Sequence, residues 1–300
     1  MLRRLILVLV AIAVTGGATF WLLTGPETVA ALPAYNASIS DGAVIFNAGG
    51  CANCHAGADR TRLGGGTALK SPFGTFHVPN ISPDPKDGIG AWTEAQFVTA
   101  LLKGTSPQGA HYYPAFPYAS YQRMRSEDVR DLFAYLKTLP AVQGRVRDHD
   151  LPFPFNIRRG LGLWKILFLD GEPLRPDPAK DAEWNRGAYL VNGPGHCAEC
   201  HSPRNLLGGI VAGQRFAGGP SLEGQGFVPN ITQGKLGNWS VEDFVDLLET
   251  GMTPGFNGVS GAMEMVIKST SQLPEADRRA MAVYLKSLPA ADAARRSDGK

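Results

Sequence analysis

The chain has 300 residues, which is enough for about two domains of ordinary size. Hydrophobic residues make up 44% and charged residues 19% of it, a composition that excludes a disordered or collagen-like chain. The formal net charge is +2 and the basic residues form no run longer than a pair such as Arg3-Arg4, so nothing in the charge pattern supports nucleic-acid binding. The 36 glycines and 22 prolines predict short helices joined by long irregular loops.

An uncharged apolar stretch, Leu5–Leu23, lies close to the N-terminus and follows Arg3-Arg4. As a helix its 19 residues reach about 28 Å, close to the thickness of a bilayer core. Residues 1–35 are therefore predicted to anchor the chain in the inner membrane by a single pass, with the arginines in the cytoplasm and the rest in the periplasm. The alternative is a signal peptide cleaved near Thr28-Val29-Ala30, which exports the chain in the same way.

All four cysteines fall in two copies of one pattern, Cys51-Ala-Asn-Cys54-His55 and Cys197-Ala-Glu-Cys200-His201. The pattern C-x-x-C-H attaches c-type haem. Two thiols three positions apart on one helical turn both reach the vinyl groups at one edge of a porphyrin, and the next residue points its imidazole at the iron. A zinc site needs a second ligand pair at matching spacing, and a redox dithiol follows a strand in a βαβ unit. Neither context is present, so the two motifs predict two covalently bound haem c groups, with His55 and His201 as iron ligands.

The chain repeats itself at a spacing of about 147 residues. Val78-Pro79-Asn80-Ile81 recurs as Val228-Pro229-Asn230-Ile231, and DVRDLFAYLKTLP from Asp128 recurs as DRRAMAVYLKSLP from Asp277. The simplest interpretation is that the chain forms two tandem, mainly α-helical domains of one fold, each with its haem motif near the start. The predicted organisation is an anchor or signal segment 1–35, a first domain 36–140, a linker 141–182, a second domain 183–290 and a disordered tail 291–300.

Three short helices are predicted in each copy. The first precedes the cysteines, around Asp41–Ala48 and Asn185–Val191. The second begins after Thr93 or Ser240, where the side chain three positions on completes a capping box, and it ends at a glycine, Gly104 or Gly251. The last helix of the first copy has five apolar residues on one face: Val129, Leu132, Phe133, Leu136 and Leu139. No stretch alternates for long enough to predict a sheet.

The linker is unusually apolar, with Leu151-Pro-Phe-Pro-Phe155 followed by Gly160-Leu-Gly-Leu-Trp164-Lys-Ile-Leu-Phe168. One interpretation is a strap packed between the two domains. The other is a patch that docks a partner or lies on a membrane surface. The sequence leaves both interpretations open.

The second axial ligand of each iron sets its role, and a methionine there raises the potential and suits an electron carrier. The first copy has one methionine, Met124. The second copy offers Met252, Met263, Met265 and Met281. Met263 follows a glycine-rich segment ahead of the last helix, whereas Met281 lies inside that helix and is expected in the core. We predict Met124 and Met263 as ligands, with Met265 as the main competitor.

The remaining histidines and two tryptophans have less specific interpretations. His77 and His111 are alternative ligands for the first iron, although exposed loop histidines are commoner. His149 is expected on the linker surface, and His196 at the rim of the second haem pocket. Trp92 and Trp239 are expected near the haems, and buried core aromatics would give the same pattern.

Together these motifs resemble the class I cytochrome c superfamily. More narrowly, the chain is similar to the cytochrome c subunits of membrane-bound alcohol and gluconate dehydrogenases and to membrane-anchored dihaem cytochromes. The resemblance is carried by Gly49-Gly50-Cys51-Ala-Asn-Cys54-His55, Pro79-Asn80-Ile81-Ser82-Pro83, His111-Tyr-Tyr-Pro114-Ala-Phe-Pro117-Tyr118 and Gly195-His196-Cys197-Ala-Glu-Cys200-His201. It implies two tandem class I cytochrome c domains. Those dehydrogenase subunits carry three haem motifs, and some relatives have methionine where this chain has Phe116.

The function expected from these residues and from the resemblance is electron transfer on the periplasmic side of the membrane. Electrons would come from a dehydrogenase and leave to an oxidase or a soluble carrier, and the chain itself would be non-catalytic or the cytochrome subunit of a dehydrogenase complex. The alternative is a dihaem enzyme of the peroxidase or thiosulfate dehydrogenase type. The known thiosulfate dehydrogenases use a cysteine ligand to iron, and this chain has no cysteine left over.

Overall fold

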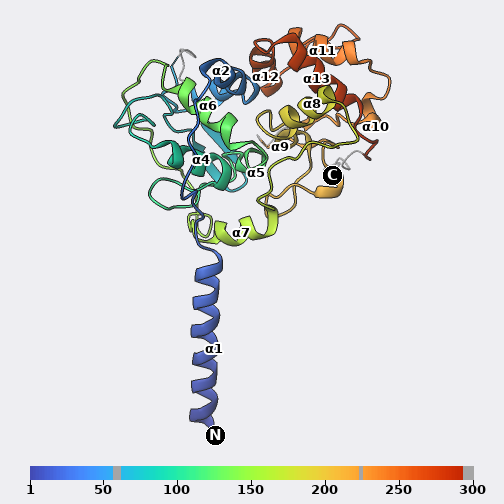
Figure 1. The fold of residues 1–300 in the computed structure, drawn as a ribbon. Coiled ribbons are helices and arrows are strands. Elements are labelled where there is room, and N and C mark those ends of the chain that lie inside the picture. The colour runs from blue at the N-terminus through green and yellow to red at the C-terminus, as the bar shows by residue number, and fades with distance from the viewer. Residues whose placement is uncertain (57–61, 223–225, 293–300) are drawn as a thin grey trace.

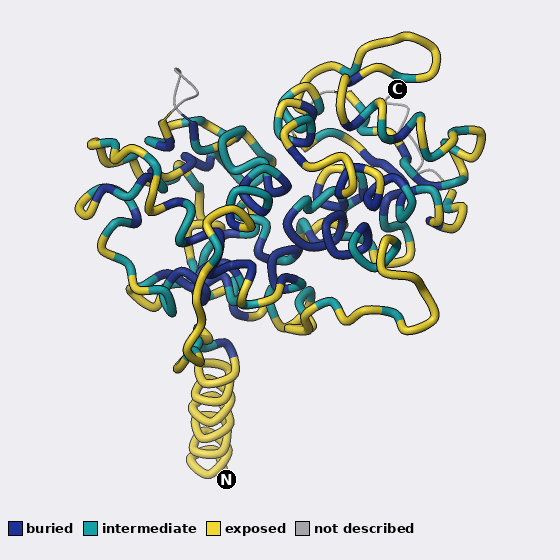
Figure 2. Tube along the Cα trace, turned by 45° about the horizontal axis from the view of Figure 1, so that its top comes forward, coloured by how far each residue is buried: buried dark blue, intermediate teal, exposed yellow. Residues whose placement is uncertain are grey.

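The computed structural model describes residues 1–56, 62–222 and 226–292. The described part is a mainly helical body carried on one long helix, α1 (Leu2–Leu23), which projects alone from the body (Figure 1). None of the residues of α1 is buried (Figure 2). The body has two halves side by side, the first drawn in blue to green and the second in yellow to red in Figure 1. Nearly all of the predicted tail, 291–300, lies outside the described residues.

The two halves contain similar elements in the same order. The first half comprises α2 (Ile39–Ala48), α3 (Cys51–His55), β1 (Ala68–Ser71), β2 (Gly74–His77), α4 (Glu94–Lys103), α5 (Tyr118–Tyr121) and α6 (Ser126–Leu136). A separate helix, α7 (Gly160–Phe168), lies in the linker. The second half comprises α8 (Ala182–Asn192), α9 (Ala198–His201), a 3-10 turn at Ala212–Gln214, β3 (Gly219–Pro220), β4 (Phe227–Val228), α10 (Gln233–Leu236), α11 (Val241–Thr250), α12 (Ala262–Thr270) and α13 (Glu275–Lys286).

Two small antiparallel hairpins correct the expectation that the chain contains no sheet. The strands β1 and β2 pair from Ala68 opposite His77 to Ser71 opposite Gly74, and Gly219 of β3 pairs with Val228 of β4. Each strand has four or two residues, which is too short for a period of two to stand out in the sequence.

The predicted capping boxes are present at the starts of α4 and α11. Thr93 Oγ1 accepts a hydrogen bond from the Gln96 amide at 3.2 Å, and Gln96 Oε1 accepts one from the Thr93 amide at 2.9 Å. Ser240 and Asp243 form the same reciprocal pair at 3.1 and 2.7 Å. Both helices end, as predicted, at a glycine in the left-handed conformation, Gly104 and Gly251.

The last helix of each half packs across the helix that precedes the haem motif. In the first half, four of the five residues of the predicted apolar face are buried on α6, with Val129 and Leu136 at its centre. The fifth, Leu139, lies beyond the end of α6 and is half-buried. Glycines allow the close crossing, because a Cβ on Gly42 of α2 would come within 2.1 Å of the Asp131 carbonyl oxygen of α6. In the second half, a Cβ on Gly187 of α8 would come within 1.9 Å of the corresponding carbonyl oxygen of α13. These crossings fix the helix ends from which the two haem motifs start.

Gly42→Ala tests this crossing. In an exposed helix the change would stabilise the protein by about 1 kcal/mol, because alanine is the better helix former. Here the added methyl group meets backbone that no rotamer change can move, so we expect the free energy of unfolding to fall by about 1–3 kcal/mol. Chemical denaturation followed by circular dichroism measures the change. Gly213→Ala, where the structure has nothing within 4 Å of the added carbon, is the matched control. A Gly42→Ala protein at least as stable as the original would contradict the close crossing.

Candidate functional site

The two C-x-x-C-H motifs begin just beyond the ends of α2 and α8. In the first motif Cys51 and Cys54 lie on the single turn of α3, and Gly50 turns the chain into it with a left-handed φ of 55°. In the second motif Cys197 precedes α9 with helical φ and ψ of −55° and −34°, so Cys197 and Cys200 also share one turn. None of the four cysteines, all in the described part of the chain, is in a disulfide.

Both motif histidines are held in the same way. His55 Nδ1 donates a hydrogen bond to the Pro79 carbonyl oxygen at 2.9 Å, and His201 Nδ1 donates one to the Pro229 carbonyl oxygen at 2.8 Å. Because the carbonyl can only accept, each Nδ1 carries the proton, and each Nε2 keeps its lone pair. Metal-binding histidines are oriented by such second hydrogen bonds. The two prolines come from the repeated Val-Pro-Asn-Ile segments, whose role the sequence did not reveal.

The surroundings of both motifs favour neutral groups. Burial lowers the pKa of His55 to about 4, and burial also lowers the pKa of His201. The rings therefore stay neutral at physiological pH, as an iron ligand must. Burial and the neighbouring cysteine raise the pKa of Cys51 and of Cys197 to about 12. These protonated thiols are unlike the thiolates of zinc sites and redox dithiols, and no cluster of three or more metal-binding side chains occurs among the described residues.

The two motifs face each other across the boundary between the halves. His196, the residue before Cys197, donates a hydrogen bond from Nε2 to the Gly49 carbonyl oxygen, two positions before Cys51, at 3.2 Å. The ring of Tyr121 packs against the ring of His196 with 5.8 Å between centroids. Burial raises the pKa of Tyr121 well above its usual value, and the nearby Cys51 raises it further. His196, expected at a pocket rim, thus joins the two motifs.

A reciprocal pair of serine contacts flanks this boundary. Ser120 of α5 donates its hydroxyl to Glu199, inside the second motif, at 2.7 Å. Ser269 of α12 donates its hydroxyl to Asn53, inside the first motif, at 3.1 Å. Asn53 and Glu199 are the corresponding residues of the two motifs, so each half supplies a serine to the motif helix of the other half. Sequence reasoning missed these four residues, because no local pattern marks them.

The candidate methionine ligands lie in different surroundings. Met124 is 1% exposed and borders the second half, where a Cβ on Gly193 would lie 3.4 Å from its Cγ. Met263 is half-buried in the first turn of α12, a helix that the sequence did not predict. Met265 is also half-buried in α12, so it stays the competitor. Met281 is buried in the core of α13, as predicted.

The other histidines have partners away from the motifs. His77 Nε2 bonds to Asp150 Oδ2 at 2.9 Å, and His111 Nε2 donates to the Thr24 carbonyl oxygen at 2.9 Å. Both rings therefore have structural roles. His149, expected on the linker surface, is half-buried and accepts a hydrogen bond from the His77 amide at 3.1 Å. The two tryptophans, Trp92 and Trp239, pack partly buried against the core.

A helical body with two C-x-x-C-H motifs, and with both motif histidines held by the same hydrogen bond, fits covalent haem and defines a c-type cytochrome. The family model for cytochrome c matches residues 39–140. The chain is 48% identical to the "Diheme cytochrome c-type" of Cereibacter sphaeroides, over 97% of this chain and 99% of that protein. It is 40% identical to the fructose dehydrogenase cytochrome subunit of Gluconobacter japonicus, over 86% of this chain. It is 35% identical to the alcohol dehydrogenase (quinone) cytochrome c subunit of Gluconacetobacter polyoxogenes, over 91% of this chain.

The chain therefore belongs to the cytochrome c family, and it resembles a dihaem member along its whole length. It spans 54% and 60% of the two dehydrogenase subunits, which are longer proteins. Two haem c groups are its covalently bound cofactors, and electron transfer is the activity of the family. The resemblance to cytochrome subunits of membrane-bound dehydrogenases is confirmed.

Cysteine substitutions test which residues attach each haem. Replacing Cys51 and Cys54 by serine removes both thioether bonds of the first motif, so we expect one covalent haem per chain instead of two. Replacing Cys197 and Cys200 by serine is the matched control, with the other haem lost. The intact mass of the denatured protein and the pyridine haemochrome spectrum count the haems. Haem that acid-acetone extracts from the unaltered protein would contradict the assignment.

Proposed function

We propose that the chain is an electron carrier built from two tandem class I cytochrome c domains, 36–140 and 183–290. The motif at 51–55 holds one haem and the motif at 197–201 holds the other. The observation that carries this proposal is the contact of the two motifs through His196 and Gly49, which holds the two attachment sites close together. An electron on one haem would then pass to the other within a single molecule.

The bound haems supply a one-electron Fe(III)/Fe(II) couple. The polypeptide joins the two attachment sites through His196, against which the ring of Tyr121 packs. Burial keeps the tyrosine protonated and the histidine neutral, since it raises the pKa of Tyr121 and lowers that of His196. A site that keeps its charges and geometry fixed needs little rearrangement when the iron changes oxidation state.

For the second axial ligands we propose Met124 on the first iron and Met263 on the second. Burial of Met124 beside the motif boundary supports the first assignment. For Met263, support comes from its half-buried place in the first turn of α12, a helix of the second half that packs against α11. A thioether is a soft, neutral ligand that favours the ferrous state, which suits a carrier.

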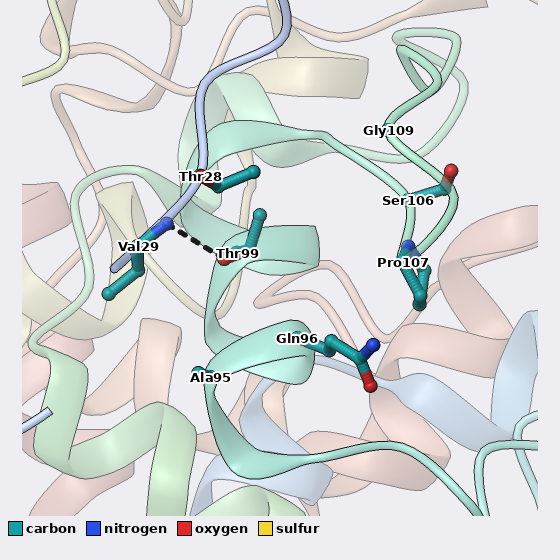
Figure 3. A pocket seen from close by; sticks show the side chains of 8 residues that line it. All are labelled: Thr28, Val29, Ala95, Gln96, Thr99, Ser106, Pro107 and Gly109. Atoms are coloured by element: carbon teal, nitrogen blue, oxygen red, sulfur yellow. Dashed lines mark hydrogen bonds between the residues drawn. The ribbon is translucent and has the colours of Figure 1, made fainter. Parts of the chain in front are cut away.

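We propose that α1 is kept as a membrane anchor, with the haem domains in the periplasm. The chain just beyond α1 is part of the folded body. Thr24 is buried, and its carbonyl oxygen accepts a hydrogen bond from His111. The Val29 amide donates to Thr99 Oγ1 at 3.0 Å, and both residues line the pocket of Figure 3. Cleavage near Thr28-Val29-Ala30 would remove these partners, which supports an anchor rather than a signal peptide.

We further propose a dehydrogenase as the electron donor and an oxidase or a soluble carrier as the acceptor. The donor assignment rests on the relatives that are cytochrome subunits of fructose and alcohol dehydrogenases. Reduction of both haems by the donor's substrate in native membranes tests it.

Methionine substitutions test the proposal that both irons belong to a carrier. Met124→Ala and Met263→Ala should each open one iron to cyanide, and the methionine–iron charge-transfer band of that haem should disappear. Met124→His and Met263→His should each lower the potential of one haem only. Optical titrations with cyanide and spectroelectrochemistry measure these changes.

The unaltered protein and Met265→Ala serve as controls, and in both proteins neither iron should bind cyanide. Loss of a charge-transfer band in Met265→Ala but not in Met263→Ala would move the second assignment to Met265. Rapid cyanide or peroxide binding at one haem of the unaltered protein would favour the dihaem enzyme over the carrier.

A further inference from the structure

The outer face of α7 is apolar and exposed. Leu163, Ile166 and Leu167 are 45%, 55% and 56% exposed, and their spacing of three and four residues puts them on one face. The single charged residue of the helix, Lys165, points the other way and donates to the carbonyl oxygens of Lys103 and Gly104 at 2.6 and 2.8 Å. A surface helix in water normally shows the opposite arrangement, with its charges outside.

This face belongs to a larger apolar surface, which we call the basal patch: Phe153, Phe155, Ile157, Leu163, Ile166 and Leu167. Contacts tie its two parts together. The ring of Phe155 packs edge-on against Phe73, which lies beside Gly208. Trp164 of α7 donates from Nε1 to the carbonyl oxygen of Leu207, in the same loop as Gly208, at 2.9 Å. The linker therefore bridges both halves as a strap, and it leaves its outer side uncovered.

The basal patch lies where α1 enters the body. A Cβ on Gly162 of α7 would come within 2.3 Å of the Thr24 carbonyl oxygen, so α7 crosses directly over the end of α1. Arg159, just before α7, donates to the Trp21 carbonyl oxygen, and its guanidinium lies 3.9 Å from the centroid of the Trp21 ring. Figure 1 shows α7 lying across the base of the body, next to the point where α1 leaves it.

The length of α1 determines the depth in the membrane at which α7 crosses its C-terminal end. Its 22 residues span about 33 Å, close to the hydrocarbon thickness of about 30 Å. Its C-terminal end, with Trp21, therefore reaches the boundary between acyl chains and headgroups, where tryptophan is favoured. Since α7 is packed on that end, its exposed apolar face lies at the same boundary.

We propose that the basal patch lies in the surface of the membrane that α1 crosses, with Leu163, Ile166 and Leu167 among the outer acyl chains. The inference rests on the proposed retention of α1. Burial of these side chains in lipid removes them from water, as in other helices that lie in a membrane interface. With α1 spanning the membrane and α7 lying in its surface, the body has a fixed tilt. That tilt decides which side of the body faces partner proteins.

Photocrosslinking of the full-length holoprotein in phospholipid nanodiscs tests this proposal. A diazirine-bearing residue replaces Leu167 in the basal patch, Val8 in the N-terminal half of α1, or Phe256, one at a time. The helices α11 and α12 lie on the side of the body away from α1 (Figure 1). Phe256, which is 86% exposed in the loop that joins them, is the matched control. Mass spectrometry measures the lipid adducts after irradiation, and the haem spectrum verifies that each protein is folded.

We expect lipid adducts at positions 8 and 167, and severalfold fewer at position 256. Adducts at position 8 without adducts at position 167 would overturn the basal-patch proposal and leave the anchor in place. Crosslinks from position 167 to protein instead of lipid would overturn it in favour of a protein interface. Adducts at neither position 8 nor position 167 would overturn the anchor, and the basal patch with it.

Discussion

The contact between His196 and the Gly49 carbonyl oxygen is the constraint on which the arrangement of the body depends. It joins the residue before the second haem motif to Gly49, two positions before the first motif, so the two attachment sites cannot move apart without breaking it. The serine contacts on either side, Ser120 to Glu199 and Ser269 to Asn53, add a reciprocal bond in each direction. The buried core continues across the same boundary, so the halves are packed as one body.

Within each half, a proline carbonyl orients the motif histidine. Pro79 and Pro229 stand at corresponding places in the repeated Val-Pro-Asn-Ile segments, and each accepts the Nδ1–H of the histidine in its own half. The bond leaves Nε2 directed away from the proline and unprotonated. The histidine orientation therefore depends on a loop far along the chain, while the cysteines depend only on a helical turn. Because both halves contain the C-x-x-C-H motif and the Val-Pro-Asn-Ile segment, the two motif histidines make the same hydrogen bond.

The sequence predicted the features that depend on neighbouring residues. These local patterns are the two C-x-x-C-H motifs, the capping boxes at Thr93 and Ser240, and the apolar face of α6. The repeat allowed corresponding elements to be predicted in both halves. Contacts between the halves could not be predicted, because Ser120 and Glu199 carry no local signal that they meet. The hairpins were missed because their strands are too short. The linker stayed ambiguous because its composition does not say which face of α7 is covered, and that depends on Thr24 and Leu207.

We propose that the paired motifs let an electron pass between two haems of one molecule. Pulse radiolysis of the Met124→His protein tests this transfer, because the lowered potential of the first haem makes an electron placed there leave for the second. We expect a first-order phase of haem re-equilibration whose rate does not change when the protein is diluted. A rate that falls in proportion to protein concentration would show that electrons move only between molecules, and not from haem to haem within one.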